Sequence, residues 1–153
     1  FFKALALPVG KSLVEDDKLD SARDIINHAK ARGVQFCLPV DHVVAPAIDA
    51  TSDTAVLKVN DTAIGDRMGL DIGPETSALY AKLVSDAKTV VWNGPMGVFE
   101  QDAFAAVGFH VESVGTGTGA IHAEGGICLS TPHGGGTAGL QGRPRRALGL
   151  IVA

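Results

Sequence analysis

The stretch TVVWNGPMGVFE, residues 89–100, joins a nearly uninterrupted apolar run to a turn rich in glycine and proline. The run 89–92 is typical of a strand in a parallel sheet, where both faces of the strand are buried. Gly94 and Gly97 carry no side-chain bulk, so the backbone there can lie close to a flat ligand or a phosphate. Ligands of such sheets bind beyond the carboxyl ends of the strands. The stretch therefore predicts a strand that ends at a candidate binding site.

A second segment of the same kind lies upstream, where MGLDIGP, residues 68–74, directly precedes a predicted helix. Polar side chains accompany the first segment: Asn93 can donate and accept hydrogen bonds, and Glu100 could accept one from a sugar hydroxyl. The spacing alone leaves two interpretations open. Both segments are binding loops, or both are tight turns between a strand and a helix.

Helical and strand patterns alternate through the first two thirds of the chain. Apolar residues recur at helical spacing over 16–32, with acidic residues at the start, basic residues near the end and Gly33 as the stop. The other predicted elements are strands at 34–39, 55–59 and 89–92, a helix at 74–86 and a helix that starts at 99. Such alternation predicts an α/β fold in which helices flank a parallel sheet.

Composition restricts the class of protein. The chain has 153 residues, of which 46% are hydrophobic, and a net charge of −4. This length suits one domain with a real core, and the negative charge argues against nucleic-acid binding. Two cysteines are too few for a disulfide framework, and no apolar run reaches the roughly 18 residues of a membrane span. These features predict a soluble, mildly acidic intracellular chain without nucleic-acid or membrane partners.

Composition also changes near residue 107. Residues 1–106 hold 7 glycines, 10 Lys or Arg and 15 Asp or Glu, whereas residues 107–153 hold 12 glycines, three arginines, two glutamates and neither lysine nor aspartate. A segment so rich in glycine loses much backbone entropy on ordering. We therefore predict two parts, an informative region 1–106 and a Gly-rich tail 107–153.

Four segments carry a resemblance to a known family. Residues 91–100 resemble the signature of phosphoglycerate kinase, and residues 68–74 are similar to a second motif of that family. Residues 9–15 and 38–45 resemble two more, in family order. Enzymes of this family have two Rossmann-like domains, one for 3-phosphoglycerate or 1,3-bisphosphoglycerate and one for Mg-ADP or Mg-ATP. The resemblance places residues 1–106 in the middle of the nucleotide domain and implies a three-layer Rossmann-like parallel sheet.

The family also implies an activity, a site and partners. The activity is reversible phosphoryl transfer between ATP and 3-phosphoglycerate in glycolysis, by an enzyme that is usually monomeric and cytoplasmic. The implied nucleotide-binding residues are Gly69, Leu70 and Val98 at the adenine, Pro95 and Glu100 at the ribose, and Asn93 near the phosphates. Mg-ATP or Mg-ADP is the implied cofactor, whereas no catalytic residue or metal ligand is implied within this sequence. Phosphoglycerate would be bound only by the amino-terminal domain of the family.

The sequence departs from the family pattern after residue 106. No Gly-Gly-Gly-Asp segment follows, and residues 130–138 only faintly resemble a late Ser-Thr-Gly-Gly-Gly-Ala turn. A reading-frame change, an assembly artefact or a diverged genuine tail would each explain 107–153, which we expect to be divergent or disordered. The substrate domain has no counterpart here. We therefore expect a phosphoglycerate kinase fragment that is inactive alone. The alternative is a non-catalytic α/β remnant without nucleotide binding.

Three other patterns predict less. Gly10-Lys11-Ser12 lacks the earlier glycine of a P-loop, so a solvated loop lysine is favoured. Residues 115–120 fit a dinucleotide-binding pattern only formally, because no acidic residue follows at the required distance. Asp41 and His42 could form a catalytic pair, but both lie in a family motif, which favours a structural role.

Overall fold

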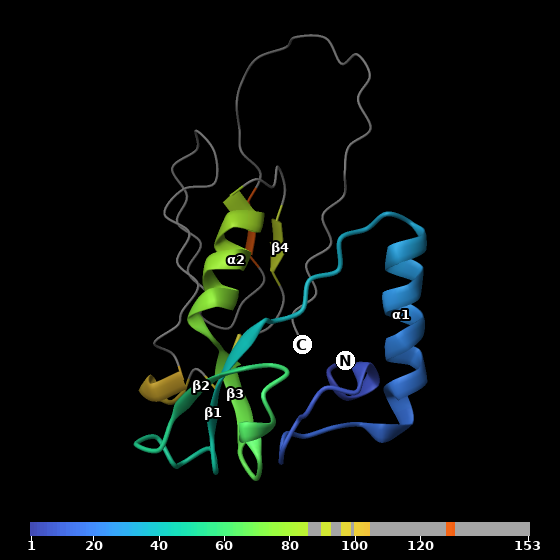
Figure 1. The fold of residues 1–153 in the computed structure, drawn as a ribbon. Helices are drawn as coiled ribbons and strands as arrows, with labels where there is room; N and C mark the ends of the chain where they lie inside the picture. Colours follow the sequence, from blue (N-terminus) through green and yellow to red (C-terminus); the bar gives the residue numbers. More distant parts are fainter. Residues whose placement is uncertain (86–89, 93–95, 99, 105–127, 131–153) are drawn as a thin grey trace.

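The computed structural model describes residues 1–85, 90–92, 96–98, 100–104 and 128–130. Its helices are α1 (Leu19–Ala31) and α2 (Pro74–Ser85), with short 3-10 helices at Lys3–Leu5, Asp16–Lys18, Thr62–Ile64 and Asp102–Phe104. Its strands are β1 (Asp41–Ala45), β2 (Ala55–Lys58), β3 (Met68–Ile72), β4 (Val90–Trp92) and β5 (Cys128–Ser130). The chain thus has both helices and strands, as the sequence predicts for an α/β protein, but no α-helix separates β1, β2 and β3, so these elements do not alternate as predicted (Figure 1).

The main sheet has the strand order β2-β1-β3, and both pairings are antiparallel. Val43 on β1 lies opposite Val56 on β2 and Asp71 on β3. The predicted parallel sheet is therefore not confirmed among the described strands, since β4 and β5 also pair antiparallel. A parallel neighbour needs a crossover connection, usually a helix. The connection 46–54 contains no α-helix and lets the chain turn back from β1 to β2. The link 59–67 then leads to β3 on the other side of β1, where β3 runs in the same direction as β2.

The prediction of a strand at 34–39 is wrong. This segment has no strand pairing, and regular pairing begins only at Asp41, beyond Pro39, which has no backbone N–H to donate. The segment contacts a side chain of α2 instead, because the Tyr80 hydroxyl donates to the carbonyl oxygen of the buried Cys37 at 3.3 Å. Residues 34–39 therefore run as an extended link between α1 and β1 (Figure 1).

The remaining predicted elements are largely confirmed. The helix predicted at 16–32 is present as a 3-10 turn followed by α1, and the one at 74–86 is α2. The strands predicted at 55–59 and 89–92 are β2 and β4. The helix expected from residue 99 is described only in part, as the 3-10 turn that ends at Phe104.

A small core covers one face of the sheet. Val43 and Ala45 of β1 pack with Leu70 of β3 and with Phe104, which is 1% exposed. Val98 is partly buried against the same cluster. Phe104 thus brings residues 100–104 to the sheet through burial of an aromatic side chain, the kind of contact that dominates core energetics.

Helix α1 lies beside the sheet rather than over it (Figure 1). It contains no buried residue and contacts the 3-10 helices that precede it. One anchor is polar, because Arg23 Nε donates to the Ala4 carbonyl oxygen at 3.1 Å. Among the described residues, no helix is both long and apolar enough to cross a membrane.

Candidate functional site

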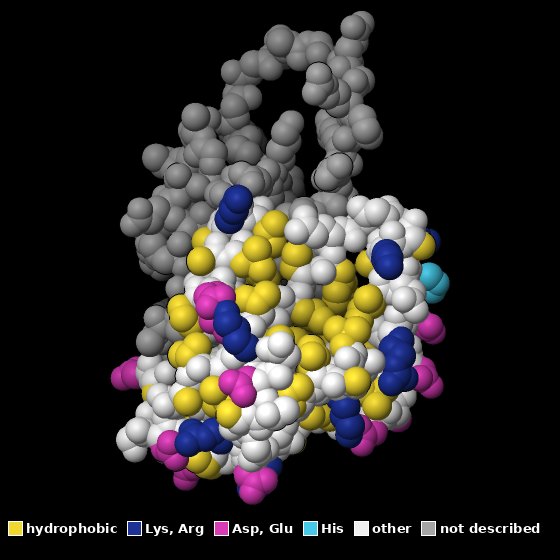
Figure 2. Space-filling view, viewed as in Figure 1, with side chains coloured by type: hydrophobic (Ala, Val, Ile, Leu, Met, Phe, Trp, Pro, Cys, Tyr) yellow, Lys and Arg dark blue, Asp and Glu magenta, His cyan; other side chains and the backbone are white. Residues whose placement is uncertain are grey.

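A pocket of about 770 Å³ lies between the amino-terminal segment and strand β3. Its walls come from residues 1–25, from β1 and β3, and from Met96 and Val98. Most of the lining is apolar, and Figure 2 shows hydrophobic side chains gathered between the side of the molecule with α1 and the side with the sheet. The volume lies within the range of small-ligand pockets, about 300–1,000 Å³. A ligand the size of a nucleoside would fit.

Three of the six predicted site residues line this one pocket: Gly69, Leu70 and Val98. The two segments that carry them are joined directly, because Val98 N–H donates to the Leu70 carbonyl oxygen at 3.0 Å. Glu100 is exposed and is not part of the lining. Asn93 and Pro95 lie outside the described residues. The structure thus brings together the residues predicted for the adenine pocket.

Ser12 braces this wall from the amino-terminal segment. Its Oγ accepts a hydrogen bond from Gly69 N–H at 2.9 Å. The neighbouring Lys11 N–H donates to the Arg67 carbonyl oxygen at 2.8 Å, and its exposed amine lies 3.7 Å from an Asp66 carboxylate oxygen. Gly10-Lys11-Ser12 is therefore a surface loop pinned to β3, as favoured over a P-loop. Nothing in the spacing of the sequence indicates the Ser12–Gly69 bond, since 57 residues separate the partners.

Asp71 is a buried carboxyl group in the wall of the pocket, 8% exposed. Burial raises the pKa of Asp71 to about 6, and the hydrogen bond from Ile72 N–H at 2.7 Å opposes this shift. The raised pKa follows from removing water from the charged form.

The carboxylate of Asp41 accepts its hydrogen bonds from the start of α2. Asp41 Oδ1 accepts from Thr76 N–H at 2.8 Å and from Thr76 Oγ1 at 2.6 Å, while Oδ2 accepts from Glu75 N–H at 3.0 Å. These donors belong to the first turn of α2, whose free N–H groups need acceptors. The structural role favoured for Asp41 is confirmed.

The pKa of Asp41 reflects two opposing effects. Burial raises it, but the hydrogen bonds from Thr76 and Glu75 and the charge of Lys58 hold the pKa below its usual value. Lys58 also forms an ion pair with Glu75, which ties β2 to the start of α2. The carboxylate therefore stays ionised while it holds β1 to α2.

His42 lines the pocket beside Gly69 and is 6% exposed. Its Nε2 is buried without a hydrogen-bond partner among the described residues. Burial lowers the pKa of His42, although the nearby Asp41 charge acts in the opposite direction. Burial thus favours the neutral imidazole. Sequence reasoning did not single out this side chain as a ligand contact, because a lone histidine in a strand carries no spacing signal.

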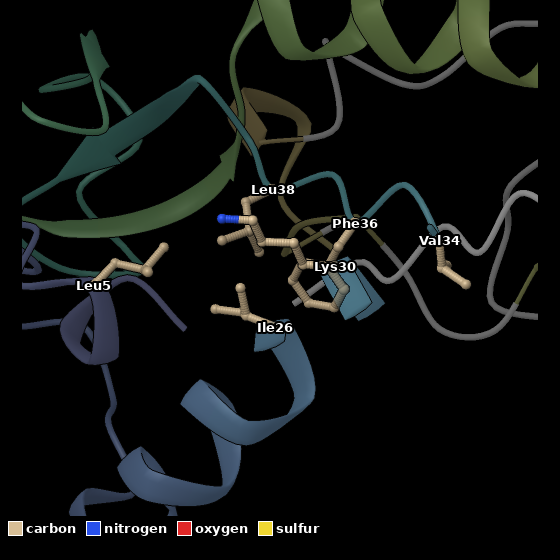
Figure 3. Close-up of a pocket in the computed structure, with 6 residues that line it drawn as sticks. All are labelled: Leu5, Ile26, Lys30, Val34, Phe36 and Leu38. Atoms are coloured by element: carbon tan, nitrogen blue, oxygen red, sulfur yellow. The ribbon is translucent and has the colours of Figure 1, made fainter. Parts of the chain in front are cut away.

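A second, smaller hollow of about 340 Å³ lies between α1 and residues 34–38. Figure 3 shows Ile26 and Lys30 of α1 reaching toward Phe36 and Leu38 of the extended segment, with Leu5 on the other side. Its lining is almost wholly aliphatic or aromatic, so it offers few groups that could orient a ligand. Within the described residues, no three His, Cys, Asp or Glu side chains are grouped so that they could hold a metal ion.

The helices, the sheet and the pocket beside Gly69 give an α/β protein with a candidate site for a small ligand. Comparison with known proteins gives the family, since the family model "Phosphoglycerate kinase" matches residues 1–126. The chain belongs to the phosphoglycerate kinase family. The match continues past residue 106, where the composition changes.

Individual relatives agree with the family model. The phosphoglycerate kinase of Clostridium novyi is 55% identical over 106 residues, which cover 69% of this chain and 26% of that protein. The phosphoglycerate kinase of Gloeothece citriformis is 47% identical over 130 residues, covering 82% of this chain and 32% of the relative. The solved phosphoglycerate kinase of Coxiella burnetii superposes with a TM-score of 0.65 at 41% identity, covering 69% of this chain and 27% of that structure.

The chain therefore spans about a quarter to a third of the length of the relatives it matches.

Proposed function

We propose that this chain supplies part of the nucleotide site of a phosphoglycerate kinase, which transfers a phosphoryl group reversibly between ATP and 3-phosphoglycerate. One observation carries the proposal: Gly69, Leu70 and Val98 line a single pocket. Family membership supports the same activity.

The residue roles follow from the character of the pocket wall. Gly69 leaves room for a flat base, while Leu70 and Val98 offer apolar contact to its faces. Glu100 is exposed and free to accept hydrogen bonds from ribose hydroxyls. Pro95 at the ribose and Asn93 near the phosphates complete the proposed set.

Phosphoryl transfer needs positioning and charge neutralisation more than covalent help from the protein. The described residues would supply positioning, by binding and orienting the nucleoside. In this proposal Mg²⁺ enters with the phosphates of Mg-ATP or Mg-ADP. When bound, the ion supplies neutralisation of phosphate charge.

We place residues 1–106 within a larger Rossmann-like nucleotide domain and treat 107–153 as a separate Gly-rich part. The change of composition near residue 107 is the basis for this division, and the family model extends past it to residue 126. In this proposal phosphoglycerate binds to another domain, so the chain alone has no turnover. We further propose that the enzyme is cytoplasmic and monomeric and has no nucleic-acid or membrane partners.

Calorimetric titration of the full chain with Mg-ADP tests the proposal. Gly69→Val would fill the pocket, because even a Cβ at residue 69 would lie 3.3 Å from His42 Nδ1. We expect the wild type to bind, and Gly69→Val to bind at least about tenfold more weakly, equivalent to ~1.4 kcal/mol. Asp24→Ala, a change on the exposed surface of α1, is the matched control and should bind like the wild type.

The same titration separates the two functions. A wild-type chain that folds but gives no heat with Mg-ADP would support the non-catalytic remnant. Equal binding by wild type and Gly69→Val would place the nucleotide elsewhere. The melting curve of each variant identifies any loss of affinity that comes from unfolding.

A further inference from the structure

We propose that His42 is a further ligand-contacting residue, whose Nε2 hydrogen-bonds the base of the nucleotide bound in this pocket. The inference rests on the proposed function, and it concerns a residue that the resemblance does not assign to the site.

The place of His42 in the sheet puts it in the wall of the pocket. It lies opposite Leu57 on β2 and Ile72 on β3, near the middle of the sheet. Its ring also adjoins Gly69, because a Cβ at residue 69 would be 3.3 Å from His42 Nδ1. His42 and Gly69 therefore form one continuous surface toward a ligand.

The buried nitrogen is the second observation. His42 Nε2 is shielded from solvent and has no hydrogen-bond partner among the described residues. Buried polar groups in folded proteins are nearly always paired, and each exception calls for a reason. A ligand that enters the pocket and meets this nitrogen supplies one.

Neighbouring polar groups are already engaged. Both carboxylate oxygens of Asp41 accept from the start of α2. Ser12 Oγ accepts from Gly69 N–H. These bonds engage Ser12 in the wall and Asp41 next to His42, whereas His42 Nε2 has no partner among the described residues.

The chemistry of the ring fits the edge of a nucleobase. A neutral imidazole has one donor and one acceptor nitrogen, and the edge of adenine likewise offers both kinds of group. The ring is also held in place, since Phe2 packs edge-to-face against it with centroids 6.4 Å apart. An oriented ring loses little entropy when it forms the bond.

Two variants at residue 42 and one control test the inference by titration with Mg-ADP. His42→Phe keeps a planar ring without nitrogen, and we expect affinity to fall about tenfold, or ~1.4 kcal/mol. His42→Gln retains a donor and an acceptor and should lose less. His28→Phe makes the same replacement at an exposed position of α1 and should bind like the wild type.

Stability of the unbound chain provides an independent measurement. Because Nε2 has no partner, His42→Phe should leave the unfolding midpoint unchanged or raise it, so weaker binding cannot be attributed to a damaged fold. A nitrogen-15 resonance of His42 that moves when Mg-ADP is added, and a control that does not, would support the contact. Wild-type binding with full affinity in His42→Phe would overturn this inference alone. No binding by a folded wild type would overturn the proposed function as well.

Discussion

The α-carbon of Gly97 lies directly against the carboxyl group of Asp71. A Cβ at residue 97 would come within 2.5 Å of both Cγ and Oδ1 of that side chain. Only glycine therefore lets residues 96–98 approach β3 closely enough for Val98 N–H to reach the Leu70 carbonyl oxygen. The contact explains, without a ligand, why a glycine stands at this point of the chain.

Gly97→Ala should therefore destabilise the protein by about 1–3 kcal/mol, the usual range for overpacking a close contact. Urea unfolding measures the change. In an Asp71→Ala background the same alanine should cost less, because the two nearest atoms, Cγ and Oδ1, are gone and only the Cβ of residue 71, at 2.8 Å, remains. A cost that is the same in both backgrounds would show that the contact does not set the requirement for glycine.

The pKa of Asp71 predicts how stability depends on pH. Since burial raises the pKa to about 6 in the folded chain, the folded state binds the proton more tightly than the unfolded state. Stability should therefore fall as pH rises from about 4 to 6, by at most about 3 kcal/mol, and then stay level. Urea unfolding at several pH values would show the fall in the wild type but not in Asp71→Asn. The same slope in both proteins would contradict the assignment.

Asp41 predicts the opposite dependence. Its pKa is lowered in the folded chain, so its contribution is complete above the usual carboxyl range and is lost as pH falls below about 4. Asp41→Ala removes the acceptor for Thr76 and Glu75 at the start of α2 and should cost about 2–3 kcal/mol at pH 7. Asp24→Ala on exposed α1 should change stability by less than about 0.5 kcal/mol. Equal effects of the two substitutions would argue against the cap.

Local patterns predict most of the elements, because helix spacing and end signals are properties of neighbouring residues. Acidic residues at its start and Gly33 after its end predict α1, and Pro74 at its first position predicts the start of α2. The direction in which neighbouring strands run is harder to predict than the elements themselves. Apolar character does not say which strand is the neighbour, so the antiparallel pairing of β1 with β2 and β3 could not be predicted from it.

The candidate site likewise has a part that could be predicted from the sequence and a part that could not. The motif resemblance selects Gly69, Leu70 and Val98, which the structure brings to one pocket. The Ser12 bond and the unpaired nitrogen of His42 depend on contacts across the fold. No periodicity in the sequence encodes them.

Gly10 provides the sharpest test of how the amino-terminal segment is fixed beside the pocket. Its φ is +54°, and a Cβ there would lie 2.0 Å from the Arg67 carbonyl oxygen, which also accepts from Lys11 N–H. Gly33 has a similar φ of +65° but open space around its α-carbon. Gly33→Ala should therefore cost only the left-handed strain, about 1–2 kcal/mol.

Gly10→Ala should cost at least about 2 kcal/mol more than Gly33→Ala, because it adds a steric clash and breaks the Lys11–Arg67 bond. Urea unfolding of the two variants compares them directly. Gly10→Ala should also weaken Mg-ADP binding, since Ser12 would no longer brace Gly69. If both alanines cost the same and leave binding unchanged, the segment before α1 does not support the pocket wall.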